Sequence, residues 1–134
     1  MSGDAATALR EAVHARLAGD AALAALLGDG GVHDTAPRGA AFPWIAAGPW
    51  RVRPLGDGGL CEHRFDLAVR SRAAGRKEAE ALAARIEALL DGTALAPAGH
   101  RLDALHVVER VTMPGRDGRS FEATASFRAV TEPI

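Results

Sequence analysis

The chain has 134 residues, of which 48% are hydrophobic and 25% are charged, and its formal net charge at pH 7 is −1. This length and composition predict a single globular domain over residues 1–134 and exclude wholesale disorder. The near-neutral charge argues against a protein that binds nucleic acid through its phosphates, because such proteins carry a basic excess.

The sequence has no cysteine pair, no long apolar run and no signal-peptide pattern, and these absences indicate the expected cellular compartment. A lone cysteine, Cys61, excludes an internal disulfide and a multi-cysteine zinc site, and it favours a reducing compartment. No apolar run approaches the roughly 18 residues of a membrane span, and the N-terminus lacks the basic and apolar regions of a signal peptide. We therefore expect a cytoplasmic assembly site and no membrane partner.

The first expected element is a helix over residues 4–27. Asp4 is a suitable N-cap, and Leu9, Val13 and Leu17 recur at four-residue intervals on one face. Gly19 and the potential N-cap at position 20 interrupt this pattern, so the last turns form a separate short helix. A glycine at position 28 ends the helical segment.

Residues 28–60 read as loops around one irregular strand. Glycines and prolines punctuate residues 28–43, although Val32 and His33 suit a short strand. The apolar run that follows predicts a strand over residues 43–52, and its prolines place it at a sheet edge or a bulge. Residues 54–59 are rich in glycine and predict a flexible loop.

The middle of the chain contains the clearest periodic patterns. Alternation of apolar and charged residues over 61–70 predicts a strand with one packed face, which includes His63 and Phe65. Residues 76–91 carry a broad apolar stripe typical of a helix, and Gly92 ends it. The strand expected at residues 100–113 has apolar residues on both parities, which indicates a bulge or burial on both faces.

The final segment predicts a hairpin. Asp117 and Gly118 form the expected tip within residues 114–119, and strict alternation from residue 120 onward predicts the last strand. The expected fold class is therefore α+β, a four-stranded mainly antiparallel sheet with two helices packed on one face. The expected element order is α-β-β-α-β-β.

Catalytic, cofactor and metal sites are not indicated. The histidines lack the spacing of a zinc hydrolase, and no cysteine pair accompanies them. Cys61 and His63 share a strand face and are the one candidate nucleophile and base. We favour the simpler interpretation, a hydrogen-bonded core histidine beside a small buried thiol.

Exposed aromatic and charged residues are the stronger candidates for function. Trp50, Arg51 and Arg53 lie together near the expected edge strand, and Arg116, Asp117 and Arg119 lie at the hairpin tip. Tryptophan and arginine are enriched where proteins meet, so these six residues are the predicted interface. An open sheet also has two unpaired edges, and a head-to-tail contact between such edges closes into a ring when the rotation permits.

Many short segments follow one another in a recognisable order and spacing over about residues 5–130: 17–28, 32–34, 37–45, Glu62-His63, 71–75, 78–90, 99–102 and Asp117-Gly118. Together they resemble the tail-terminator or tail-completion family of long-tailed phages and gene-transfer agents. His33 departs from this pattern, since the family often has tyrosine there.

The resemblance implies a structural protein without a catalytic residue. A member of this family forms a hexameric ring at the head-proximal end of the tail tube, stops tube polymerisation and joins the tail to the head. The implied partners are other copies of the chain, the major tail tube protein and the head-tail connector or stopper protein. DNA only passes through the lumen, and the implied location is the tail of a virion or gene-transfer particle.

Three alternatives remain open from the sequence. The nearest is a head-side stopper or neck protein, which differs in the partner that it contacts. A second is a small cytosolic enzyme that uses Cys61 and His63, and a third is a monomeric binding module. The sequence does not decide between a virus and a gene-transfer agent.

Overall fold

The computed structural model describes residues 4–134, which form three helices and five strands. The elements in chain order are α1 (Ala5–Ala18), α2 (Ala21–Leu27), β1 (Val32–His33), β2 (Trp44–Pro54), β3 (Cys61–Ser71), α3 (Lys77–Leu90), β4 (His100–Pro114) and β5 (Phe121–Pro133).

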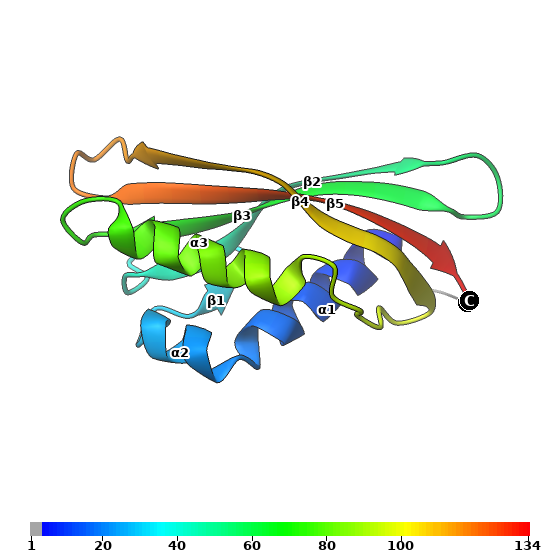
Figure 1. Ribbon diagram of the computed structural model, residues 1–134, viewed down its shortest axis with the longest axis horizontal. Helices are drawn as coiled ribbons and strands as arrows, with labels where there is room; N and C mark the ends of the chain where they lie inside the picture. The colour runs from blue at the N-terminus through cyan, green and yellow to red at the C-terminus, as the bar shows by residue number, and fades with distance from the viewer. Residues whose placement is uncertain (1–3) are drawn as a thin grey trace.

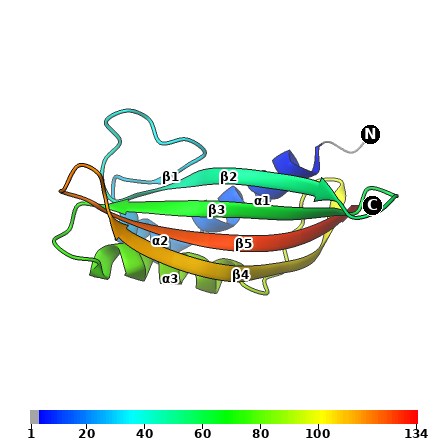
Figure 2. The same cartoon turned by 90° about the horizontal axis from the view of Figure 1, so that it is seen from above.

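The strands form one sheet in the order β1-β2-β3-β5-β4. β1 pairs parallel with β2, and the other three pairings are antiparallel. All three helices lie beneath the same face of this sheet (Figure 1). The opposite face, toward the viewer in Figure 2, has no helix over it, and we call it the open face.

The expected fold class was wrong in its sheet and in its helix count. The sheet has five strands and is mixed, because Val32 and His33 pair parallel with Ile45 and Ala46. There are three helices among the described residues, because the chain leaves α1 at Gly19 and begins again at α2. The order is therefore α-α-β-β-β-α-β-β.

Aspartates begin both N-terminal helices. Asp4 accepts a hydrogen bond from the Thr7 amide, and Asp20 accepts one from the Leu23 amide at 2.8 Å. These bonds satisfy amide groups that the first turn of a helix leaves free. Asp20 also receives two hydrogen bonds from the Arg85 guanidinium, at 2.7 and 2.9 Å, so the same carboxylate ties α2 to α3.

The core lies between the sheet and the helices. α3 buries a continuous apolar stripe that includes Leu82, Ile86 and Leu90, as its periodicity predicted. At the sheet, Phe65 stacks on Trp50 with ring centroids 4.1 Å apart and on Phe127 at 5.3 Å. These three aromatic rings come from β2, β3 and β5 and join the middle strands to one another.

Both long outer strands are irregular. β2 has a register shift between Ala47 and Trp50, and β4 has shifts between Leu102 and Ala104 and between Val107 and Glu109. The predictions of a bulge in each segment are confirmed. The shifts explain why apolar residues occur at both odd and even positions of residues 100–113. Each inserted residue changes which alternate positions of the strand face the core.

Candidate interaction surfaces

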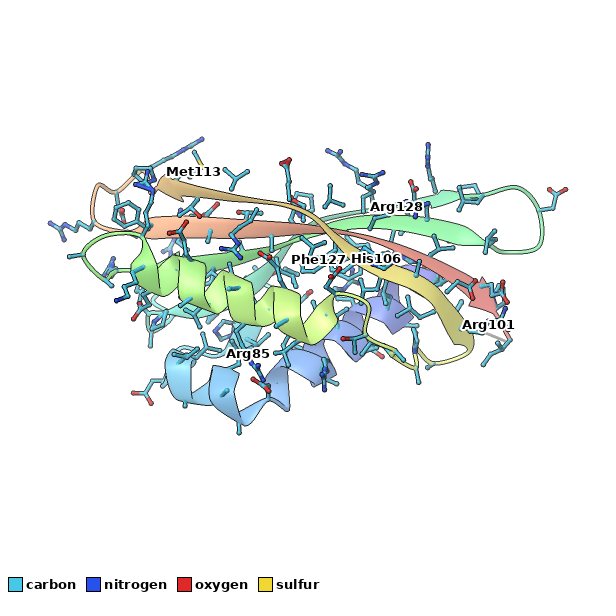
Figure 3. The ribbon with its side chains drawn as sticks, viewed as in Figure 1. Arg85, Arg101, His106, Met113, Phe127 and Arg128 are labelled. Atoms are coloured by element: carbon cyan, nitrogen blue, oxygen red, sulfur yellow. The ribbon has the colours of Figure 1, made fainter. Side chains whose placement is uncertain are left out.

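The open face is rich in charge of both signs. It takes alternate side chains from β2, β3, β5 and β4, as the pairing register dictates. Figure 3 shows Met113 and Arg128 on this side of the sheet, whereas Arg85 lies beneath it between α3 and the N-terminal helices. The charged residues on this face are Arg51, Arg53, Arg64, Arg70, Arg101 and Arg128 with Glu62, Asp66, Glu109, Glu122 and Glu132.

Glu62 is the centre of an ionic network on this face. Its carboxylate is only 5% exposed, although the strand face around it is open. Arg128 donates to it at 2.6 Å, Arg53 donates at 2.9 Å, and the Arg64 Nε lies 3.8 Å away. The hydrogen bond from Arg128, aided by the charge of Arg53, holds the pKa of Glu62 below its ordinary value.

Glu62→Gln is expected to lower stability at neutral pH and to flatten its dependence on acid. A carboxyl group with a lowered pKa stabilises the fold above its ordinary pKa of 4.5, and this contribution is lost as the pH falls through the folded value. Denaturant melts between about pH 3 and about pH 7 measure the difference. Glu11→Gln, on the exposed side of α1, is the control, and parallel pH profiles for wild type and Glu62→Gln would contradict the network.

The predicted interface residues fall into separate places. β2 ends and β3 begins beside the loop of residues 55–60, whereas β4 ends and β5 begins beside the hairpin of residues 115–120. These two loops lie at opposite ends of the sheet (Figure 1). Trp50, Arg51 and Arg53 therefore do not adjoin the Arg116, Asp117 and Arg119 tip.

Asp117 organises the hairpin from within. Its Oδ1 accepts hydrogen bonds from the Arg119 amide, the Ser120 amide and the Ser120 hydroxyl, all at 2.8–2.9 Å. The backbone bond from Arg119 and the bonds from Ser120 lower the pKa of Asp117 to about 2. The carboxylate is thus engaged, while Arg116 and Arg119 are exposed on either side of it.

Trp50 lies on the opposite sheet face from its neighbours Arg51 and Arg53. Its indole packs against Phe65 and receives the Arg10 guanidinium over its ring at 5.5 Å. It also lines a hollow of about 560 Å³ between α1 and the β1–β2 edge, together with His14, His33 and Asp34. Arg51 and Arg53 project on the open face, where Arg53 binds Glu62.

His63 is a fully buried, hydrogen-bonded core histidine, as expected. Its Nδ1 lies 3.3 Å from the Trp50 indole nitrogen, which donates to it, and its Nε2 lies 2.9 Å from the Thr131 hydroxyl. Burial lowers the pKa of His63, so the neutral ring is favoured. Both ring nitrogens are therefore engaged by groups other than a thiol.

Cys61 is only half-buried, so the expectation of a buried thiol was wrong. Its sulfur lies 3.4 Å from the Gly59 carbonyl, to which it donates. Across residues 4–134, no hydrogen bond joins Cys61 to His63, and no group of three or more potential ligands is placed to hold a metal ion. No helix in the described part of the chain is long and apolar enough to cross a membrane.

The sequence reasoning missed two features of the sheet edges. Val108, Val111 and Met113 on β4 are each about half exposed, although they are large and apolar. At the other edge, residues 35–42 enclose a hollow of about 800 Å³ against Trp44 and Ala46. The mixed parity of residues 100–113 was the available signal for the first feature, and the loop conformation behind the second has no comparable signature.

These features define a small α+β domain with an open, charged sheet face and incompletely paired strand edges. The family model described as "Tail completion protein gp17" matches residues 11–132. The chain therefore belongs to the tail completion protein gp17 family and is a phage-type tail structural protein, which confirms the resemblance inferred from its sequence.

A solved structure agrees over the whole domain. A chain in the structure titled "Virion of native gene transfer agent (GTA) particle" is 31% identical and superposes with a TM-score of 0.87. The alignment covers 97% of this chain and 99% of that one. The search of curated proteins found no significant match.

Proposed function

We propose that this protein forms a hexameric ring that closes the head-proximal end of a phage-type tail tube. In this role it stops tube polymerisation and joins the tail to the head connector, and it works within a virion or gene-transfer particle. The observation that carries the proposal is the end-to-end likeness to a chain of a gene transfer agent virion.

The sheet edges support assembly into a ring. Among the described strands, β1 pairs with the outer side of β2 at Ile45 and Ala46, and none pairs with that side along the rest of β2. Within residues 4–134, β4 has no partner strand beyond β5, although the Gly92 amide donates to the Leu105 carbonyl and the Val107 amide donates to the Asp91 carboxylate. Because unpaired edges favour association with further chains, two such edges on one subunit are suited to a closed head-to-tail assembly.

The two loop-bearing ends of the sheet are suited to different partners. Arg116 and Arg119 of the hairpin, with Asp117 holding its shape, are proposed to contact one neighbouring ring. Trp50, Arg51 and Arg53 are proposed to contribute to contacts at the β2 edge. The near-neutral charge of the chain suits a lumen through which DNA passes without being held.

No catalytic residue is needed for this role. The rival function, an enzyme built on Cys61 and His63, requires a free base beside the thiol. His63 instead has its two nitrogens against Trp50 and Thr131 in the core. We therefore infer a structural protein, with neither cofactor nor metal.

A polymerisation assay tests the proposal. Purified major tail tube protein is allowed to assemble with and without this protein, and tube lengths are measured by electron microscopy. Addition at a substoichiometric amount is expected to shorten the tubes and to leave extra density at one end only. Tubes of unchanged length with bare ends would contradict a terminating role.

A further inference from the structure

The edge strand β4 carries an exposed apolar strip on the open face. Val111 and Met113 pair with Thr124 and Glu122, whose side chains belong to that face. They are 49% and 52% exposed, and Figure 3 shows Met113 pointing away from the helices. Exposed apolar residues gathered at a strand edge favour contact with another surface.

The opposite edge of the same face carries a hollow lined mostly by small and aromatic residues. Its lining includes Phe42, Trp44 and Ala46, with residues 35–41 as its outer wall. The Arg72 guanidinium lies over the Phe42 ring at 4.3 Å from its centroid and borders the same hollow. With a volume of about 800 Å³, the hollow has room for more than one apolar side chain.

The pairing register places the strip and the hollow at the same level along the strands. One cross-strand row runs from Trp44 through Arg70 and Glu122 to Met113. The next row runs from Ala46 through Ala68 and Thr124 to Val111. A rotation about an axis parallel to the strands does not change the position of a residue along the strand direction. Such a rotation therefore brings the β4 strip of one copy beside the hollow of the next copy.

Charges are complementary one step further along the strands. Glu109 on β4 shares its row with Ser126 and Asp66, and Arg51 on β2 lies in the following row. Both side chains are exposed, and neither has an ion pair or side-chain hydrogen bond within residues 4–134.

We propose that the β4 edge of one copy docks on the β2 edge of the next, with Met113 and Val111 at the loop hollow and Glu109 paired with Arg51. This contact rests on the proposed ring and specifies its interface. The strands support it, because three successive antiparallel pairings make β2 and β4 run in opposite directions. A head-to-tail junction between β4 and the part of β2 that β1 leaves unpaired is therefore antiparallel, like the pairings of β2 with β3, β3 with β5 and β5 with β4.

Charge exchange between the two residues tests the contact. Glu109→Arg and Arg51→Glu are each expected to raise the concentration needed for half-assembly by about tenfold or more, because each places like charges together. The double variant Glu109→Arg with Arg51→Glu restores the pair and is expected to assemble like wild type. The control is Lys77→Glu, which lies on the exposed first turn of α3 and replaces a positive by a negative charge, as Arg51→Glu does. This control is expected to assemble normally.

Cysteine crosslinking supplies an independent readout. Arg51→Cys with Glu109→Cys, in a Cys61→Ser background, is expected to give a ladder of covalent multimers on a non-reducing gel. Within one copy these positions are three strand spacings apart, about 14 Å, which is beyond the reach of a disulfide. Each single-cysteine variant is the control and yields dimers at most.

The outcomes separate this contact from the ring itself. Failure of the double variant to recover assembly, or absence of a ladder while wild type is hexameric, would overturn the Glu109–Arg51 contact and leave the ring standing. A wild-type protein that stays monomeric at every concentration would overturn both. Recovery by charge exchange together with the ladder would establish the interface.

Discussion

Phe65→Ala is expected to lower the free energy of unfolding by about 3–5 kcal/mol. The Phe65 ring is 1% exposed and lies between Trp50 and Phe127, so its loss leaves a cavity that neither neighbour can fill without moving. The three rings come from separate strands, and the cavity therefore weakens the packing of the whole sheet centre. Urea denaturation followed by circular dichroism measures the change.

The matched control for this cavity is Val108→Ala. Val108 is 49% exposed at a bulge of β4, so its truncation is expected to change stability by less than about 0.5 kcal/mol. Equal stability losses for Phe65→Ala and Val108→Ala would mean that the parity of β3 is opposite to the one described.

His63→Leu is expected to cost about 1–3 kcal/mol at neutral pH and to remove a component of acid sensitivity. Leucine fills the space but leaves the buried Thr131 hydroxyl without its partner. In wild type, burial lowers the pKa of His63 below its ordinary value of 6.5. As the pH falls, His63 therefore binds a proton in the unfolded chain before it does so in the folded chain. Stability therefore falls as the pH drops below about 6.5, and the variant lacks this slope.

A double variant separates the lost hydrogen bond from the lost imidazole. His63→Leu with Thr131→Val replaces both partners by apolar groups, which is expected to recover part of the stability. Thermal melts at several pH values measure both effects. An unchanged pH slope in His63→Leu would show that the buried imidazole does not contribute to the acid sensitivity.

Patterns with a strict period could be read correctly from the sequence. The alternation around Phe65 and the stripe that includes Leu82 both identified their buried faces, because one side of each element packs on the core. The four-residue spacing of Leu9, Val13 and Leu17 did the same for α1. In each case burial is decided locally by the repeat of the element.

The fifth strand depends on a distant contact. β1 has only two residues, Val32 and His33, and it is a strand because Ile45 and Ala46 lie alongside it. A hydrogen bond from the Ile45 amide to the Gly31 carbonyl extends this pairing. Two residues are too few to show a period of alternation. Whether they form a strand is therefore determined by the residues beside them in space and not by their own sequence.

The candidate site was predictable only in part. Exposure of Arg116 and Arg119 follows from a hairpin tip. Arg51 was expected near an edge strand, and it lies on β2, which has β1 on its outer side at Ile45 and Ala46. The side of Trp50 was not evident, because the register shift after Ala47 turns its indole toward the core. The match in level between the β4 strip and the loop hollow depends on the full register of four strands, which no local pattern encodes.

The proposed ring requires copies of this chain to close upon one another. Native mass spectrometry of the purified protein at high concentration is the decisive test of this self-association. We expect a discrete six-subunit species that dissociates to monomer on dilution, and at a higher concentration in the Glu109→Arg variant than in wild type. A strictly monomeric spectrum across the whole concentration range would contradict the claim.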